Sequence, residues 1–429
     1  MTKRLKILNS GAAFLKTKVL RKLFVFCAVL AVCPLLTAQS SSGAHLGRRY
    51  LILGDSGPPP APAGEDSPLA ELARRMDGYF DFYNSFFHFP QDPDRPPLAL
   101  RIFRDKTAFD AYLEEFGGEN HGGFVFLRFS DPAKNELAGY LTGDEERDGM
   151  RLAHYGLVQF LRTFALDPPL WLQLGFAAYF ERSVYLPETR QVIFVENFNW
   201  LAPLRSIMAS YRAAGPFRER EPNLGRILSL SREQAEAEPE RAYAESWGLV
   251  TFLLKSPRQE YNRILWESLA ALDYRASRTE NEERIRARAF DWVDLPQLTA
   301  DYGAFVEELR SLPELLEEGT RLYHGGDYEN AERAFLRARE FQPDHPLAYY
   351  YLGLIRYLAG DYAAAADYYD RSLKQGGDPA LCHYALGLTW YADGRPEAAR
   401  PYLEQALLGD PQGAGARAKV LLDYLDSLE

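Results

Sequence analysis

The residues whose types and spacing come closest to a catalytic centre surround His154. A hydrolytic zinc site takes two histidines one helical turn apart, a third ligand from a neighbouring element, and a glutamate that removes a proton from the zinc-bound water. In this sequence Tyr155 follows His154 where that pattern has the glutamate, and Val158 stands where it has the second histidine. One imidazole cannot hold catalytic zinc. We therefore predict that His154 is a vestigial position, with no catalytic residue, no metal and no cofactor.

Other residues would have to reach the same cleft to rebuild a site. Glu181 and Glu245 are the acids expected near it, and acids alone would give at most a weak cation site. None of the other histidines after residue 38 makes a close pair with His154 on one helical face: His45, His88, His121, His324, His345 and His383. His154 shares a helical face with Val158 and Leu161, so the simplest interpretation is a buried, hydrogen-bonded core residue.

The segments around His154 resemble the active-site region of gluzincin metallopeptidases. They are Arg151–Val158, Pro169–Glu181 and Tyr243–Leu253, and the resemblance extends over residues 49–309. It implies an α+β peptidase-like domain with a mostly helical second half. The resemblance also places Leu174 at the position of the third zinc ligand. Because the motif is degenerate at Tyr155, Val158 and Leu174, the resemblance implies a pseudopeptidase, more a scaffold than an enzyme.

The periodicity of apolar residues predicts the elements that position these segments. Pro168 and Pro169 predict a tight turn between the two helices that carry the motif. The charge runs 144–146 and 280–283 are interpreted as solvated faces. The strand-containing part and the helical part are expected to share one core within a domain of residues 39–310, after a proline-rich link at 57–64. Strands are predicted at 49–54, 99–103, 123–129 and 138–141, and helices at 67–87, 106–116, 149–165, 170–181, 200–213, 241–255 and 260–272.

From residue 311 onward the sequence repeats itself with a period of 34 residues. Small residues that recur in paired helices let the two helices of a unit approach closely, and larger residues at a fixed offset fill the gap between units. The matching positions are Gly319, Gly353 and Gly387; Gly326, Gly360 and Gly394; Ala331, Ala365 and Ala399; and the larger Phe335, Tyr369 and Leu403. These residues resemble the tetratricopeptide repeat (TPR) consensus. We predict an all-α solenoid of three repeats over residues 311–429, closed by a capping helix from Ala414 to Leu428.

In TPR proteins the first helix of each repeat lines a groove that receives a peptide or a partner helix. The corresponding side chains here are aromatic or aliphatic and almost uncharged: Leu316, Tyr323, Tyr350, Leu354, Tyr357, Tyr384, Leu388 and Tyr391. An apolar or aromatic-rich protein segment fits such a groove. The same tyrosines are equally suited to stacking the repeats on one another.

The first 38 residues differ from the rest of the chain. Seven Lys and Arg residues and no acid precede or flank an apolar run from Leu23 to Leu36, which ends in the small residue Ala38. This is the pattern of a secretory signal peptide, and the run is shorter than the roughly 18 residues of a spanning helix. The alternatives to cleavage of the leader are its retention and lipidation at Cys33. Membrane contact is expected only in these two cases. We expect an exported protein in the periplasm or bacterial envelope.

The charge and cysteine content after this leader limit the partners. Removal of the leader would take the formal net charge from −11 to −18, which disfavours nucleic acid as a partner. Cys382 would be the sole remaining cysteine, so no internal disulfide is expected.

Three functions are compatible with this sequence. The first is a non-catalytic exported protein that joins a pseudopeptidase scaffold to a protein-binding TPR array. The second is a hydrolase that uses an unrecognised site in the same cleft. The third is a structural subunit of a cell-envelope assembly. Polar side chains converging on His154 would favour the second function, the hydrolase. An apolar plug formed by Val158 and Leu174 would argue against it.

Overall fold

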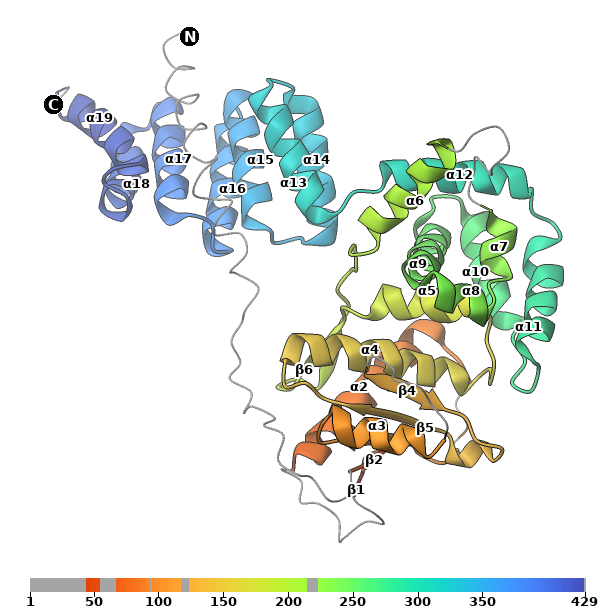
Figure 1. Ribbon diagram of the computed structural model, residues 1–429. Helices are drawn as coiled ribbons and strands as arrows, with labels where there is room; N and C mark the ends of the chain where they lie inside the picture. Colours follow the sequence, from red (N-terminus) through yellow and green to blue (C-terminus); the bar gives the residue numbers. More distant parts are fainter. Residues whose placement is uncertain are drawn as a thin grey trace. The chain divides into compact units, whose positions relative to one another are not determined.

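The computed structural model describes residues 44–54, 67–90, 92, 95–116, 123–213 and 223–427. These residues form two compact units, one ending at Leu309 and the other starting at Arg310. The predicted leader and the proline-rich link lie outside the described residues. Each unit is taken by itself below, with the element labels of Figure 1.

A five-stranded mixed sheet opens the first unit (Figure 1). Its order is β1 (Ala44–Leu46), β2 (Tyr50–Leu53), β3 (Leu98–Phe103), β5 (Glu136–Tyr140) and β4 (Phe124–Leu127). The β2–β3 and β3–β5 pairs are parallel, whereas β1 and β4 run antiparallel to their neighbours.

Successive strand residues point to opposite faces of this sheet. Ile102 and Leu137 therefore join the main core with α2 (Pro68–Phe87), whereas Phe103 and Ala138 pack with α3 (Lys106–Glu114) on the other face. The sheet is thus covered by a helix on each face.

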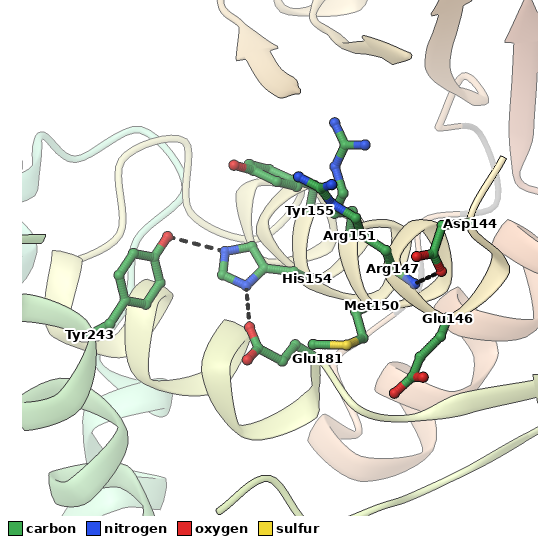
Figure 2. A pocket seen from close by; sticks show the side chains of 9 residues that line it. All are labelled: Asp144, Glu146, Arg147, Met150, Arg151, His154, Tyr155, Glu181 and Tyr243. Atoms are coloured by element: carbon green, nitrogen blue, oxygen red, sulfur yellow. Dashed lines mark hydrogen bonds and ion pairs between the residues drawn. The ribbon is translucent and has the colours of Figure 1, made fainter. Parts of the chain in front are cut away.

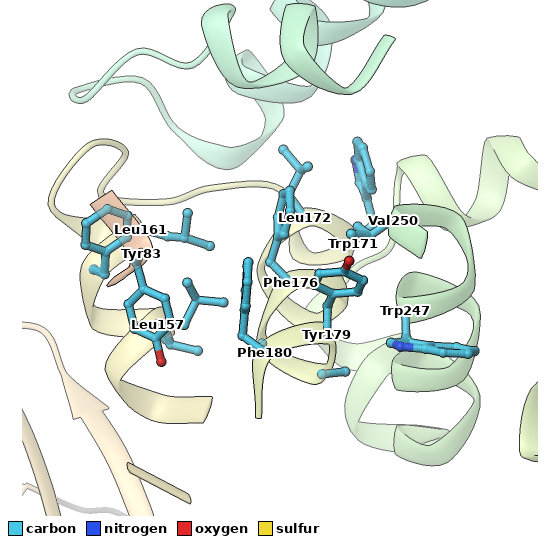
Figure 3. Close-up of a cluster of buried hydrophobic side chains, with 14 of the residues drawn as sticks. Tyr83, Leu157, Leu161, Trp171, Leu172, Phe176, Tyr179, Phe180, Trp247 and Val250 are labelled. Carbon is cyan, nitrogen blue, oxygen red and sulfur yellow. The ribbon is translucent and has the colours of Figure 1, made fainter. Parts of the chain in front are cut away.

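Two helices carry the motif segments, α4 (Glu145–Arg162) and α5 (Leu170–Phe180). Every residue of α5 is buried, and Gly175 lets it approach α9 (Pro239–Lys255), since a Cβ there would lie 2.5 Å from the carbonyl oxygen of Ser246. Figure 3 shows the resulting core, in which aromatic side chains of α5 lie between α4 and α9. Burial on all sides fixes α5 in place.

The remaining elements complete the first unit. One hydrophobic cluster runs from Tyr50 to Leu309, so the strands and the helices share a core. These elements are η1 (Pro132–Lys134), β6 (Val184–Leu186), β7 (Gln191–Ile193), α6 (Leu201–Ala213), α7 (Leu224–Leu228), α8 (Arg232–Ala237), α10 (Gln259–Ala270), α11 (Arg278–Ile285), η2 (Arg286–Phe290) and α12 (Leu295–Glu308). Of these, α6, α7, α8, α10 and α12 contact α9.

The second unit consists of helix pairs followed by a last helix. The pairs are α13 (Leu312–His324) with α14 (Tyr328–Phe341), α15 (Pro346–Leu358) with α16 (Tyr362–Lys374), and α17 (Pro379–Ala392) with α18 (Pro396–Gly409); α19 (Ala414–Asp426) follows.

The repeated glycines of the second unit have two separate roles. A Cβ on Gly319, Gly353 or Gly387 would lie within 2.6–2.8 Å of Phe335, Tyr369 or Leu403 respectively. These larger residues therefore fill the space inside each helix pair, and not only the gap between pairs as the repeat pattern predicts. A second set of repeated glycines, Gly326, Gly360 and Gly394, has φ of +79° to +81°. These glycines allow the left-handed backbone turn between the paired helices.

Most predicted elements are present with shifted ends. The helix predicted from Gly149 begins at Glu145, because Asp144 caps it by accepting a hydrogen bond from the Arg147 amide. The run 144–146 is therefore a cap and a first helical turn. The run 280–283 lies on α11, where Asn281 is buried, so that run is not a wholly solvated face. The short strands β1, β6 and β7 were not predicted, since three residues carry too little periodicity to be recognised.

Candidate functional site

His154 lies on the wall of an open cavity of about 410 Å³ in the first unit (Figure 2). The side chain comes from the middle of α4, and most of the other lining residues come from the same helix and its cap. The lining is Asp144, Glu146, Arg147, Met150, Arg151, His154, Tyr155, Glu181 and Tyr243. Eight of these nine residues therefore belong to α4, its cap or the end of α5, and Tyr243 comes from α9.

The imidazole of His154 is hydrogen-bonded through both ring nitrogens. Nδ1 lies 3.1 Å from Glu181 Oε2, and Nε2 lies 3.2 Å from the hydroxyl of Tyr243. An ionised carboxylate only accepts hydrogen bonds, so Nδ1 carries the proton and, in the neutral ring, Nε2 accepts from Tyr243. Burial raises the pKa of the Tyr243 phenol, which keeps that proton on its oxygen at neutral pH.

Glu181 is itself held in place from the other side. Asn197 donates from Nδ2 to Glu181 Oε1 over 2.7 Å, and the Trp200 indole donates to the same oxygen over 3.2 Å. The Trp200 ring stacks on Tyr243 with 5.2 Å between centroids. The three groups of the His154 hydrogen-bond chain are thus fixed in orientation, as a proton-transfer site would require.

The three positions at which zinc chemistry would need other residues are occupied by packing side chains. Tyr155 stacks on Phe124 with centroids 5.6 Å apart, Val158 is buried in the main core, and Leu174 is buried in a small apolar cluster at the far end of α5. Within the described residues, no group of three or more His, Cys, Asp or Glu side chains could hold a metal ion. The cleft has polar side chains converging on His154, and Val158 and Leu174 are not part of its lining.

Arg151 is the most constrained charged residue of the cavity. Its guanidinium lies over the rings of Phe124 and Tyr140, at 4.9 and 5.0 Å from their centroids, and Nη1 contacts Asp148 Oδ1 at 3.3 Å. Only glycine fits opposite it, since a Cβ on Gly123 would lie 1.5 Å from Arg151 Nη2. Burial raises the pKa of neighbouring Tyr155, although the Arg151 charge acts in the opposite direction.

Of the two acids expected near the cleft, one lines it. Glu181 bonds to His154, whereas Glu245 is only 2% exposed and belongs to a separate network. Tyr211 donates to Glu245 over 2.6 Å, Arg241 contacts it at 3.2 Å, and Arg226 donates to its second oxygen. A buried carboxylate with three donors is a structural junction between α6, α7 and α9.

The sequence missed Tyr243, Asn197 and Trp200 as partners of this site. Tyr243 does open the third motif segment, and its place one helical turn before Trp247 was the available signal. The interactions themselves join positions far apart in the chain, which no local periodicity reveals.

The predicted groove residues all lie on the first helices α13, α15 and α17 of the repeats. Leu316, Leu354 and Tyr384 are buried, whereas Tyr323, Tyr350, Tyr357, Leu388 and Tyr391 are half-buried. Some also pack within the unit. The ring centroids of Tyr350 and Tyr369 are 5.8 Å apart, and Arg417 of α19 lies over the Tyr384 ring. The half-buried members are the ones that leave side-chain surface for a partner.

Comparison with known proteins identifies the second unit. A family model of the tetratricopeptide repeat matches residues 316–380 and again residues 359–417. The C-terminal unit therefore contains TPR repeats, which are protein-interaction modules. No curated protein matches the chain. None of the described helices is long and apolar enough to cross a membrane.

Proposed function

We propose that this protein is an exported, non-catalytic binding protein in which a pseudo-metallopeptidase scaffold is fused to a TPR array that holds a polypeptide partner. The observation that carries the proposal is the TPR match over residues 316–417. Half-buried Tyr and Leu side chains on α15 and α17 support an apolar or aromatic-rich segment as the ligand, with Arg417 as a charged group beside Tyr384.

The scaffold role of the first unit rests on what stands in place of zinc ligands. Tyr155, Val158 and Leu174 pack against other side chains, and both nitrogens of His154 are already hydrogen-bonded. Export rests on the basic and apolar leader ahead of residue 39. A location in the periplasm or envelope follows from export if the source is bacterial, and a structural role in an envelope assembly is one form this binding could take.

Peptide selection on the purified mature chain tests the groove. Peptides recovered from a random display library are expected to be apolar or aromatic-rich. Tyr357→Ala and Leu388→Ala should each weaken their binding, measured by fluorescence anisotropy, by about tenfold or more, as truncation of an interface anchor does. Leu408→Ala on α18, where the side chain is 75% exposed, is the matched control and should leave affinity unchanged. Equal loss in all three variants would contradict the assignment of the groove.

A hydrolase acting in the His154 cleft is the second candidate. It is favoured by the fixed chain of Tyr243, His154 and Glu181, which could move a proton at Nε2 while Glu181 stabilises the imidazolium. Hydrolysis that survives a chelator but is lost in Glu181→Gln would support this candidate over the scaffold.

A further inference from the structure

The acids of the His154 cavity are already engaged by partners. Asp144 caps α4 by accepting from the Arg147 amide over 3.1 Å. Glu146 contacts Arg182 at 3.4 Å, and Glu181 receives hydrogen bonds from three side chains. Each acid of the cavity therefore already has at least one polar partner.

The groups of the cavity that remain free are donors. Within the described residues, the Arg147 guanidinium has no ion pair and the Tyr155 hydroxyl has no hydrogen-bond partner. Arg151 Nη2 is buried and also has none. Because burial raises the pKa of Tyr155, its hydroxyl keeps its proton and donates at neutral pH.

These three donors form one stripe along α4. Residues 147, 151 and 155 are spaced four apart, so their side chains follow one face of the helix. That face borders the cavity, since all three residues line it. Two guanidinium groups and a phenol on one wall make a surface for a negatively charged, planar, oxygen-bearing group.

We propose that this cavity binds a carboxylate group of a ligand, with Arg147 and Tyr155 as its direct hydrogen-bond donors and Arg151 as a positioning and electrostatic residue. The volume of about 410 Å³ is within the usual range for small-ligand sites, so it accommodates a short peptide end or a small organic acid. The binding does not depend on the TPR groove or on any zinc chemistry.

The two sources of a carboxylate are separated with three probes on the purified mature chain. The probes are acetyl-dialanine, its C-terminal amide, and succinate, titrated by saturation-transfer NMR and calorimetry. At least one of the two carboxylates, acetyl-dialanine or succinate, should bind saturably. The affinity of the amide should be at least roughly tenfold lower than that of acetyl-dialanine. Binding of acetyl-dialanine alone identifies a peptide C-terminus as the source, and binding of succinate alone identifies a free acid.

Variants assign the binding to these donors. Arg147→Gln and Tyr155→Phe should each weaken the bound carboxylate roughly tenfold. Arg263→Gln and Tyr274→Phe are matched controls, because both residues are exposed and do not line the cavity. Tyr155→Phe keeps the ring that stacks on Phe124, and near-ultraviolet circular dichroism verifies the fold of each variant.

Three results would overturn the proposal. They are no saturable binding of either carboxylate, equal binding of the amide, or unchanged affinity in both Arg147→Gln and Tyr155→Phe. Tyr357→Ala in the TPR groove should leave carboxylate binding intact, so failure of the groove assignment is seen separately.

Discussion

At the scale of single residues, the hydrogen bonds of His154 decide what this side chain can bind. Its Nδ1 is used by Glu181 and its Nε2 by Tyr243, so a metal ion would have to displace Tyr243 to reach the lone pair. No second histidine lies one turn away to offset that loss, because Val158 is at this position. A catalytic zinc ion needs three protein ligands, which this cleft does not provide among the described residues.

The zinc content of the purified mature protein is therefore predicted to be substoichiometric. After dialysis against trace zinc, inductively coupled plasma mass spectrometry should give the same low value for the wild type and for His154→Ala. Stoichiometric zinc that disappears in His154→Ala would show that the ligand assignment is wrong and would favour the hydrolase.

The residues of the site were predictable to different degrees. The buried, hydrogen-bonded state of His154, which is 9% exposed, agrees with the prediction made from its helical face. The pairing of His154 with Glu181 and Tyr243 joins residues 27 and 89 positions apart, and it depends on how α4, α5 and α9 pack. The free donors at Arg147 and Tyr155 were not predictable from the sequence, because tertiary contacts decide which acids of the cavity have partners and which donors have none.

At the scale of elements, the sequence was most informative where a pattern repeats. The 34-residue period predicts each helix pair of the second unit, because glycine and a large side chain recur at fixed offsets. The β6–β7 hairpin has no such repetition and pairs only three residues per strand, so tertiary contacts decide it. The boundaries of α4 depend on the Asp144 cap, a local signal that resembles an ordinary surface charge.

The close approach inside each helix pair predicts the effect of enlarging its glycine. In Gly353→Ala the new methyl group would lie 2.6 Å from the Tyr369 ring, which is fully buried and cannot move freely. Overpacking of this kind should lower the free energy of unfolding by about 1–3 kcal/mol. Gly303→Ala in α12 meets no atom within 4 Å and should raise it by about 0.5–1 kcal/mol. Urea unfolding followed by circular dichroism measures both, and a stabilised Gly353→Ala would refute the packing argument.

At the scale of the whole molecule, the two units have separate hydrophobic cores. The main core of the first unit is a cluster that includes Trp171 and Trp247, whereas the TPR unit has its own clusters. Cys382 lies in the TPR unit, where it is 1% exposed and where burial raises the pKa of its thiol to about 11. At pH 8 little thiolate is present, so alkylation of Cys382 reports unfolding of that unit.

Separate cores predict that a defect in the first unit leaves the TPR unit unaffected. Glu245→Ala removes the buried carboxylate that binds Arg226, Arg241 and Tyr211, and should destabilise the first unit by about 3–5 kcal/mol. Five of the six tryptophans lie in the first unit and Trp390 lies in the TPR unit, so the main fluorescence transition of the mature chain should then move to lower urea, while the urea midpoint for Cys382 alkylation stays in place. Glu236→Ala, an exposed residue of α8, is the matched control and should shift neither transition. If the alkylation midpoint moved together with the fluorescence transition, the two units would unfold as one, and the first unit and the TPR unit would have to be treated as a single cooperative body.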